Sequence, residues 1–505
     1  MKDGSLQKGS LRKSAVVLTS SKIVTYTISL VTTMLLSRFR TLSEFGTYSQ
    51  ILIVVNLMVS IFMLGLPFSL NYFMARAGTE EEKNKFLSLY YTVNTALSIV
   101  VGLIVVAIMP LAEAYFDNRL LSAFLYFGAV YPWTRIITSS VENLLIIFNK
   151  SNLLIAYQVA HSVALVLLVL VVQLLGWTFS DYMVLFLLVE IVFTIIVYYI
   201  ASQRAGRLRL VLDKRMIYEL FKFAVPLGLA TAVGTLKAET DKLLIGYLYT
   251  VEELALYANA AREIPITLIS ASLTAVLLPQ IARLVKHNDM AGAVRLWKDT
   301  IVLSLLINSF FGFGLFVFSA EAVDFLYSDR YFKGAQVFGV YSLTYIIRCT
   351  YYGMILNSSG NTKYILKSSV YSLVLNALLD VLFHSFFGFI GPAVATVVAT
   401  AFGAWYLLYN TSKISRVPFG DIFPWKNSGV ILLVNVCLGI LFYLVRGTTP
   451  VFKAMGGRAE AFLLASVWAA ALFLIFRKTI RSKWRAFRVV ENVGEAQTGE
   501  INEAL

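Results

Sequence analysis

The sequence predicts an all-α integral membrane protein with about fourteen transmembrane helices. Of its 505 residues, 58% are apolar and 14% are charged, whereas soluble domains average about 45–50% and about 25%. The apolar residues also gather in runs of about 20, the length that a helix needs to cross a bilayer. These observations exclude a soluble enzyme, a disordered chain and a nucleic-acid-binding protein, although the formal net charge is +14.

Each predicted span is an apolar run bounded by charged or turn-forming residues. The first run is too long for a cleaved signal peptide and contains Lys22, so we expect it to remain in the protein. In chain order, the fourteen expected spans are residues 15–37, 48–74, 86–111, 120–148, 152–176, 182–202, 218–247, 254–284, 297–320, 335–358, 362–387, 391–411, 428–446 and 460–476.

The positive charges between these spans lie mostly on one side. With alternate loops assigned to opposite sides, 29 of the 43 Lys and Arg residues fall on the side of the N-terminus, ten on the other and four within spans. Basic loops stay in the cytoplasm. We therefore expect a multi-pass protein of the plasma (inner) membrane with both termini cytoplasmic.

Short sequence matches recur at two nearly equal spacings. At an offset of 209, the matching residues are Leu35, Thr41, Glu44 and Tyr48 with Leu244, Thr250, Glu253 and Tyr257. At an offset of 210, they are Tyr131, Thr134, Ile136 and Ile137 with Tyr341, Thr344, Ile346 and Ile347. The agreement predicts that spans one to six are repeated as spans seven to twelve, in the same orientation because six is even.

This repeat predicts two six-helix lobes with two additional helices after them. The tail begins basic and ends acidic, and we expect its first part to lie on anionic lipid. The expected segments are a cytoplasmic N-terminus at 1–14, an N-lobe at 15–202, a cytoplasmic linker at 203–217, a C-lobe at 218–411, helices thirteen and fourteen within 428–476, and a cytoplasmic tail at 477–505.

Four cations within the spans are the candidate substrate-binding residues. Ionisable groups inside a membrane are costly and usually functional, and parallel-repeat transporters commonly bind substrate between their halves. Arg135 and Arg348 occupy nearly equivalent places in spans four and ten, and Lys22 and Arg262 lie in spans one and eight. Because the guanidinium fork donates two parallel hydrogen bonds to phosphate, these residues predict a cavity for a diphosphate-bearing anion.

Acidic residues in the spans leave a structural role open for these charges. Glu142 follows Arg135 by two turns on one helical face, so the two side chains are candidate partners. Lys237 and Asp241 are one turn apart and predict an ion pair. If transport is coupled to a cation, Glu142 and Asp380 are the candidate ligands.

Catalytic signatures are missing from the sequence. It contains no GxxxxGK[ST], HExxH or GxSxG motif. Its three His residues are too few and too scattered for a histidine-based metal site, and we expect the two Cys residues, which lie inside apolar spans, to be small core residues. We therefore expect a protein that is not an enzyme, binds no metal or cofactor, and draws energy from an ion gradient, the membrane potential or the substrate gradient.

Several segments resemble the polysaccharide flippases (Wzx-type) of the multidrug/oligosaccharidyl-lipid/polysaccharide (MOP) exporter superfamily. They are "LLSRFRTLSEFGTYSQ" at 35–50, "MLGLPFSLNYFMAR" at 63–76, "ETDKLLIGYLYTVEELALYANAAREI" at 239–264, "VLLPQIARL" at 276–284 and "FGFIGPAVATVVAT" at 387–400. The resemblance implies a MATE-like, V-shaped pair of bundles. It also implies that an undecaprenyl-diphosphate-linked oligosaccharide or polysaccharide repeat unit moves from the inner to the outer leaflet by alternating access. Expected partners are this lipid-linked sugar, membrane lipids, a polysaccharide polymerase and glycosyltransferases, but no nucleic acid.

Three alternatives stay open. Some relatives that flip the peptidoglycan lipid precursor use cavity arginines on helices 1, 2 and 8; Lys22 and Arg262 are chemically similar, but span 48–74 carries no charge. A cation-coupled multidrug antiporter of the same fold usually has a buried acid in its first lobe, and spans one to three have none in their middle. A membrane scaffold would need no arginine within the membrane.

Overall fold

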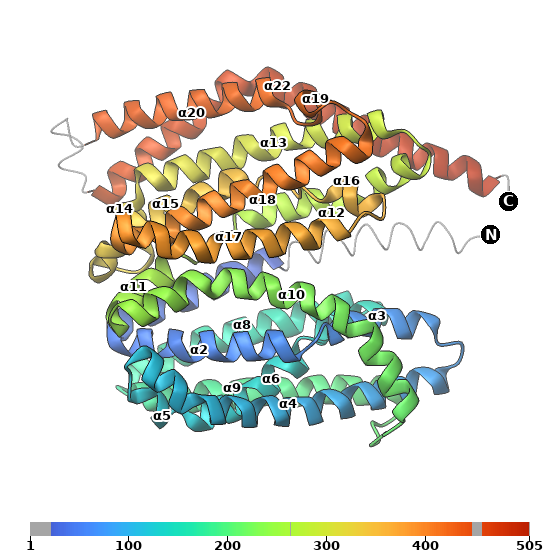
Figure 1. The fold of residues 1–505 in the computed structure, drawn as a ribbon, viewed down its shortest axis with the longest axis vertical. Helices are drawn as coiled ribbons and strands as arrows, with labels where there is room; N and C mark the ends of the chain where they lie inside the picture. Colours follow the sequence, from blue (N-terminus) through green and yellow to red (C-terminus); the bar gives the residue numbers. More distant parts are fainter. Residues whose placement is uncertain (1–21, 263, 447–456, 504–505) are drawn as a thin grey trace. The chain divides into compact units, whose positions relative to one another are not determined.

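The computed structural model describes residues 22–262, 264–446 and 457–503, and every element in these ranges is a helix (Figure 1). The predicted N-terminal segment 1–14 lies outside the described residues. Within the described part, eight helices are long and apolar enough to cross a membrane, or nine if the bent pair Lys214–Pro226 and Thr231–Leu248 forms one span. The all-helical, multi-pass fold is confirmed, whereas the number fourteen stays a prediction.

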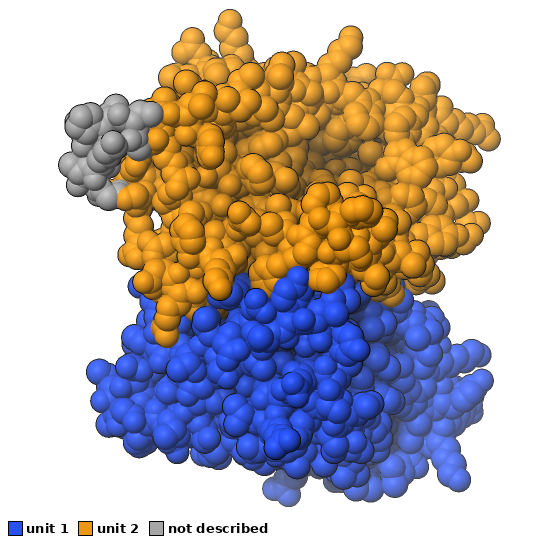
Figure 2. All heavy atoms as spheres, turned by 60° about the vertical axis from the view of Figure 1, so that its left-hand side comes forward, with its two compact units in different colours: residues 1–258 blue, residues 259–505 orange. Residues whose placement is uncertain are grey.

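The chain forms two compact units, residues 1–258 and 259–505 (Figure 2). Helix α11 (Val251–Ala260) crosses the boundary between them. Unit 1 contains helical residues 22–39, α2 (Leu42–Phe62), α3 (Leu66–Arg76), α4 (Glu80–Phe116), α5 (Leu120–Ala123), α6 (Leu125–Thr138), α7 (Val141–Ile147), α8 (Ser151–Leu174), α9 (Phe179–Ala205) and α10 (Lys214–Leu248). Unit 2 contains α12 (Thr267–Lys286), α13 (Met290–Val317), α14 (Ser319–Leu326), η1 (Asp329–Gly334), α15 (Ala335–Ile347), α16 (Met354–Ser358), α17 (Lys363–Phe387), η2 (Gly388–Ile390), α18 (Gly391–Ser415), α19 (Phe419–Ile422), α20 (Trp425–Val445) and α22 (Gly457–Glu503).

Both copies of the repeat begin their helices in the same way. Helix α13 begins 210 positions after α4, and α11 begins 209 positions after α2. Thr41 and Glu44 form a capping box at the start of α2. Their counterparts Thr250 and Glu253 exchange the same two hydrogen bonds at the start of α11, each 3.2 Å long. These residues match in sequence because each pair satisfies backbone N–H groups that the first helical turn leaves without partners.

The second set of matches also corresponds to a shared hydrogen bond. The Thr134 hydroxyl donates to the carbonyl of Tyr131 at 2.8 Å, and the Thr344 hydroxyl donates to the carbonyl of Tyr341 at 2.7 Å. Both bonds lie in the last part of a helix, α6 in one copy and α15 in the other. The repeat therefore extends from the sequence to local backbone geometry.

Several predicted spans are interrupted, which corrects the expectation of continuous helices. Span 120–148 is divided into α5, α6 and α7, span 335–358 into α15 and α16, and span 254–284 into α11 and α12. Between α6 and α7, the hydroxyls of Ser139 and Ser140 donate back to backbone carbonyls at 2.6 and 2.7 Å. Hydropathy does not register such breaks because serine is only weakly polar and its hydroxyl is satisfied locally.

Helix α10 packs closely on the start of α3. Gly65 caps α3 with a φ of +68°, a left-handed conformation that favours glycine. A Cβ added to Gly228 of α10 would lie only 2.1 Å from the carbonyl carbon of Leu64. Because α10 packs against α2 and α3, the boundary between the units lies well beyond the predicted linker 203–217.

One carboxylate connects the end of the linker to both α10 and α4. Asp213 accepts hydrogen bonds from the backbone N–H groups of Arg215 and Met216 at the start of α10. It also pairs with Lys85 of α4, with 2.8 Å between Oδ2 and Nζ. The hydrogen bond from Lys85, with those from the backbone, holds the pKa of Asp213 below its ordinary value.

Candidate functional site

Arg135 lies in the last turn of α6 with its side chain exposed. Its guanidinium hydrogen-bonds the Tyr131 side chain, and Tyr48 and Glu190 are further electrostatic neighbours. Backbone carbonyls at the C-terminal end of a helix favour a cation there. Arg135 therefore lies at a position that stabilises its charge, with its guanidinium beside Tyr131 and Glu190.

Glu190 and His161 form a contact that the sequence analysis missed. Glu190 of α9 is only 3% exposed. His161 Nε2 on α8 lies 3.0 Å from its Oε1, so the carboxylate near Arg135 is also held from a second helix. Two isolated polar residues in separate apolar runs gave no signal of this pairing, because hydropathy does not show which helices pack together.

Lys22 and Glu142 form an ion pair 2.6 Å long, with side chains 43% and 37% exposed. This corrects the expected pairing of Glu142 with Arg135. The two residues do not share a continuous helical face, because α6 ends at Thr138 and Glu142 lies in α7. Lys22 consequently has a carboxylate partner, which makes it a weaker candidate for binding an anion than Arg135.

Arg348 follows the last residue of α15 and donates its backbone N–H to the Thr344 carbonyl at 2.8 Å. Its side chain is partly exposed. The next residue, Cys349, is 1% exposed, and its Sγ lies 3.8 Å from the Tyr352 hydroxyl. Each unit thus places an arginine at the C-terminal end of an interrupted helix, an arrangement that the sequence did not reveal.

Arg262 lies in the break between α11 and α12. The backbone N–H of Ile264 donates to the hydroxyl of Tyr345 at 3.1 Å, and that hydroxyl lies 3.5 Å from the carbonyl oxygen of Arg262. Tyr345 is one turn before Arg348 on α15. Within unit 2, the Tyr345 hydroxyl therefore links the break after α11, which carries Arg262, to the end of α15, which carries Arg348.

Asp380 belongs to a buried polar cluster between α17 and α18. The Asn376 amide donates to Asp380 Oδ1 at 2.7 Å, and the Thr396 hydroxyl lies 3.4 Å from Asn376 Oδ1. All three side chains are at most 5% exposed. The sequence analysis identified the carboxylate but missed its two neutral neighbours, which carry no charge to mark them.

Asp241 is buried on α10 and accepts hydrogen bonds from the Tyr257 hydroxyl at 3.1 Å and the Lys242 backbone N–H at 2.8 Å. Nearby, Lys242 and Glu239 form an ion pair of 2.9 Å. The contact between Lys237 and Asp241 stays a prediction. Among the described residues, no group of three or more His, Cys, Asp or Glu side chains could hold a metal ion.

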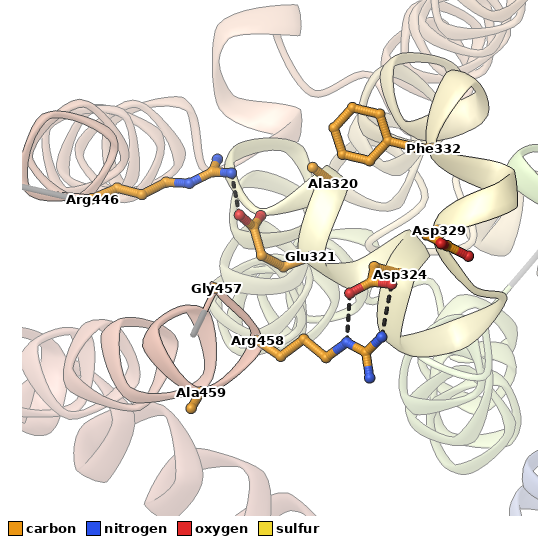
Figure 3. A pocket seen from close by; sticks show the side chains of 9 residues that line it. All are labelled: Ala320, Glu321, Asp324, Asp329, Phe332, Arg446, Gly457, Arg458 and Ala459. Atoms are coloured by element: carbon orange, nitrogen blue, oxygen red, sulfur yellow. Dashed lines mark hydrogen bonds and ion pairs between the residues drawn. The ribbon is translucent and has the colours of Figure 1, made fainter. Parts of the chain in front are cut away.

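Unit 2 also contains a charged pocket of about 620 Å³ between α14, η1 and the facing ends of α20 and α22 (Figure 3). Arg446 pairs with Glu321. The guanidinium of Arg458 donates to both carboxylate oxygens of Asp324, with 2.8 Å between Nη2 and Oδ1. Figure 3 shows both arginines pointing at these carboxylates. The charges that line the pocket pair with one another, so these ion pairs hold α14 to the ends of α20 and α22.

We expect Glu321→Gln to lower the free energy of unfolding by about 1–2 kcal/mol, because it removes a charge-assisted bond at a side chain only 12% exposed. Asp324→Asn should cost less, since Arg458 is 56% exposed and water screens that pair. Thermal unfolding in detergent measures both. Equal effects of the two variants would contradict the burial argument.

Residues 35–336 match the model of a family described as "Polysaccharide biosynthesis protein". The probable low-salt glycan biosynthesis flippase Agl15 of Haloferax volcanii is 24% identical over 270 residues, which are 50% of this chain and 57% of that protein. The probable lipid II flippase MurJ of Rickettsia prowazekii is 24% identical over 198 residues, which are 37% and 38% of the two chains. The matches thus cover less than two thirds of these relatives.

Solved structures share the fold over most of the chain. Lipid II flippase MurJ in an inward closed conformation has a TM-score of 0.74 at 17% identity, covering 92% of this chain and 100% of that one. An inward-facing multidrug resistance MATE transporter of the MOP superfamily has a TM-score of 0.59 at 13% identity, covering 81% and 98%. The MATE-like fold expected from the sequence is confirmed.

Proposed function

The chain belongs to the polysaccharide biosynthesis protein family, and from this premise we propose that it is a flippase for a lipid-linked oligosaccharide or polysaccharide repeat unit. The substrate would be an undecaprenyl-diphosphate-linked sugar, moved from the inner to the outer leaflet by alternating access. A polysaccharide polymerase and glycosyltransferases are the proposed partners on either side of this step.

The observation that carries the proposal is the place of the two arginines. Arg135 and Arg348 come from equivalent helices of the repeat, and each stands at the end of an interrupted helix. A diphosphate offers several oxygens to a guanidinium fork, and the attraction strengthens as the local dielectric falls. We propose that both bind the diphosphate or acidic sugars, with Arg262 as a further contact in unit 2.

The proposed transport needs no nucleotide. A charge that crosses the membrane changes its energy by about 2.3 kcal/mol per 100 mV. Export of a dianion toward a positive exterior is therefore favoured by the potential itself. If a cation or proton is coupled as well, we propose that Asp380 binds it, because Asp380 is a buried carboxylate that the Asn376 amide holds in place, while the oxygen of that amide accepts from Thr396.

Asp380→Asn is expected to remove the response of transport to an imposed ion gradient, because the amide neither carries charge nor takes up a proton. The rate under the gradient should fall roughly tenfold, while export down a substrate gradient continues. Asp117→Asn is the matched control, since Asp117 is an exposed turn residue in a left-handed conformation that Asn also adopts. A gradient response equal to that of the unmodified protein would assign Asp380 a structural role.

The experiment that tests the identity of the substrate compares the two kinds of lipid-linked sugar named for the flippase relatives. The purified protein would be placed in vesicles with either a fluorescent undecaprenyl-diphosphate oligosaccharide or the peptidoglycan precursor, lipid II. A reagent that cannot cross the membrane then measures the fraction of each lipid that reaches the other leaflet. Movement of the oligosaccharide supports the proposal, movement of lipid II alone supports the alternative, and movement of neither favours a scaffold.

We also propose that both termini are cytoplasmic, as the asymmetry of basic loops indicates. Reporter domains fused at Asp181 and Lys214 should then read outside and inside, respectively, because α9, which is long and apolar enough to cross a membrane, separates these positions. The measurement is reporter activity in cells. The opposite pattern would contradict the cytoplasmic location of the termini.

A further inference from the structure

A basic pocket of about 480 Å³ lies in unit 2 between the first turns of α13, the segment before α19, and α22. Its charged lining comprises Arg295, Lys298 and Asp299 of α13 together with Lys483 of α22. Three cations thus face one carboxylate. Because the excess is positive, the pocket suits an anion.

The carboxylate already has a partner, and a second cation has spare donors. Lys483 Nζ lies 2.5 Å from Asp299 Oδ1, which joins α22 to α13. Lys298 Nζ donates to the backbone carbonyl of Asp421 at 2.7 Å and, as an ammonium group, has two further N–H donors. Arg295 is exposed, and within the described part of the chain it makes no ion pair. The pocket therefore offers donors that no residue of its lining uses.

The exposed surface of α22 changes from apolar to basic just before the pocket, as expected where a helix leaves the hydrocarbon core of a bilayer. Phe473, Leu474 and Ile475 of α22 are strongly exposed apolar residues, as expected of a lipid-facing surface. After the buried Phe476 come the exposed residues Arg477 and Lys478, so apolar surface gives way to basic surface within one turn. Lys483 lies just beyond this change.

An aromatic cluster on the same side of the pocket places it at the same level. The Trp425 ring lies 5.6 Å from that of Phe419 and 4.8 Å from that of Phe423, and Trp425 is 44% exposed. Aromatic side chains, Trp above all, gather at the boundary between lipid and water. Asp421, which holds Lys298, lies within this aromatic segment.

We propose that this pocket binds the phosphate of an anionic phospholipid headgroup, such as that of phosphatidylglycerol. Arg295 and Lys298 contact the phosphate, and Lys483 approaches it from α22. The acyl chains of the lipid lie along the exposed apolar residues of α22. This apolar surface beside the pocket favours a lipid over a free phosphate ion, and the inference is independent of the transported substrate.

The test uses the full-length protein in nanodiscs of phosphatidylcholine, titrated with phosphatidylglycerol, with bound lipid counted by native mass spectrometry. Arg295→Gln should weaken phosphatidylglycerol binding about fivefold, and the double variant with Lys298→Gln should weaken it further by a similar factor. Lys426→Gln is the matched control, because Lys426 is an exposed cation near the same end of unit 2 but outside the pocket. Its binding should not change.

Asp299→Asn separates a lipid site from a simple helix clamp. It breaks the ion pair with Lys483, yet lipid binding should persist or strengthen, since the phosphate then becomes the partner of Lys483. The proposal would be overturned if the Arg295→Gln protein bound phosphatidylglycerol as tightly as the unmodified protein does. The proposal would also be overturned if inorganic phosphate, added to the protein in phosphatidylcholine nanodiscs, protected it against thermal unfolding as well as phosphatidylglycerol does. The ligand would then not be a lipid.

Discussion

Replacing Arg348 by Ala is expected to reduce export of a lipid-linked oligosaccharide tenfold or more, and Arg135→Ala should have a comparable effect. Each substitution removes a guanidinium and with it the charge-assisted hydrogen bonds to the diphosphate, which contribute roughly 1.5–3 kcal/mol each. A difference of 1.4 kcal/mol is already a factor of ten. The measurement is export in vesicles at matched protein levels.

Two companion variants distinguish substrate binding from folding. Arg348→Lys keeps the positive charge but loses the planar fork, so its export should fall between that of the unmodified protein and the Ala variant. Arg119→Ala is the control, because Arg119 is an exposed arginine in the turn before α5. Normal export by both Arg135→Ala and Arg348→Ala would make these arginines structural, and the binding site would then be sought around Lys22 and Arg262.

Gly228→Ala is expected to prevent accumulation of the folded protein. The added Cβ would lie 2.1 Å from the carbonyl carbon of Leu64 and 2.6 Å from the backbone nitrogen of Gly65. Backbone atoms cannot rotate away as a flexible side chain can. Separating α10 from α3 would therefore cost at least about 4–5 kcal/mol, the range of the most damaging single substitutions.

The same helix provides the matched control. A Cβ added to Gly234 of α10 would meet nothing within 4 Å, and Ala is a better helix former than Gly by about 1 kcal/mol. Gly234→Ala should therefore leave the protein level and thermal stability unchanged or improved. Size-exclusion profiles of fluorescently tagged variants from membranes provide the measurement. A monodisperse Gly228→Ala protein in normal yield would show that α10 and α3 can separate without loss of the fold.

The helices and their repeat could be predicted because composition and spacing are local properties of the chain. The capping boxes at Thr41 and Thr250 are examples, since the residues that form each box lie three apart. The pairing of Lys22 with Glu142 joins elements that are distant in sequence, so no local pattern indicates it. Asn376 and Thr396 were missed for another reason, because neutral polar residues are common in apolar helices and only their packing around Asp380 distinguishes them.

The break after α15 also supplies a native chemical reporter. Cys349, directly after Arg348, is buried, and the only other cysteine of the chain is Cys437. A Cys437→Ala protein would therefore carry a single thiol at the very segment proposed to meet the substrate. Its rate of alkylation by a membrane-permeant maleimide measures how often that segment opens, so substrate-dependent protection or exposure could be followed without introducing any label site.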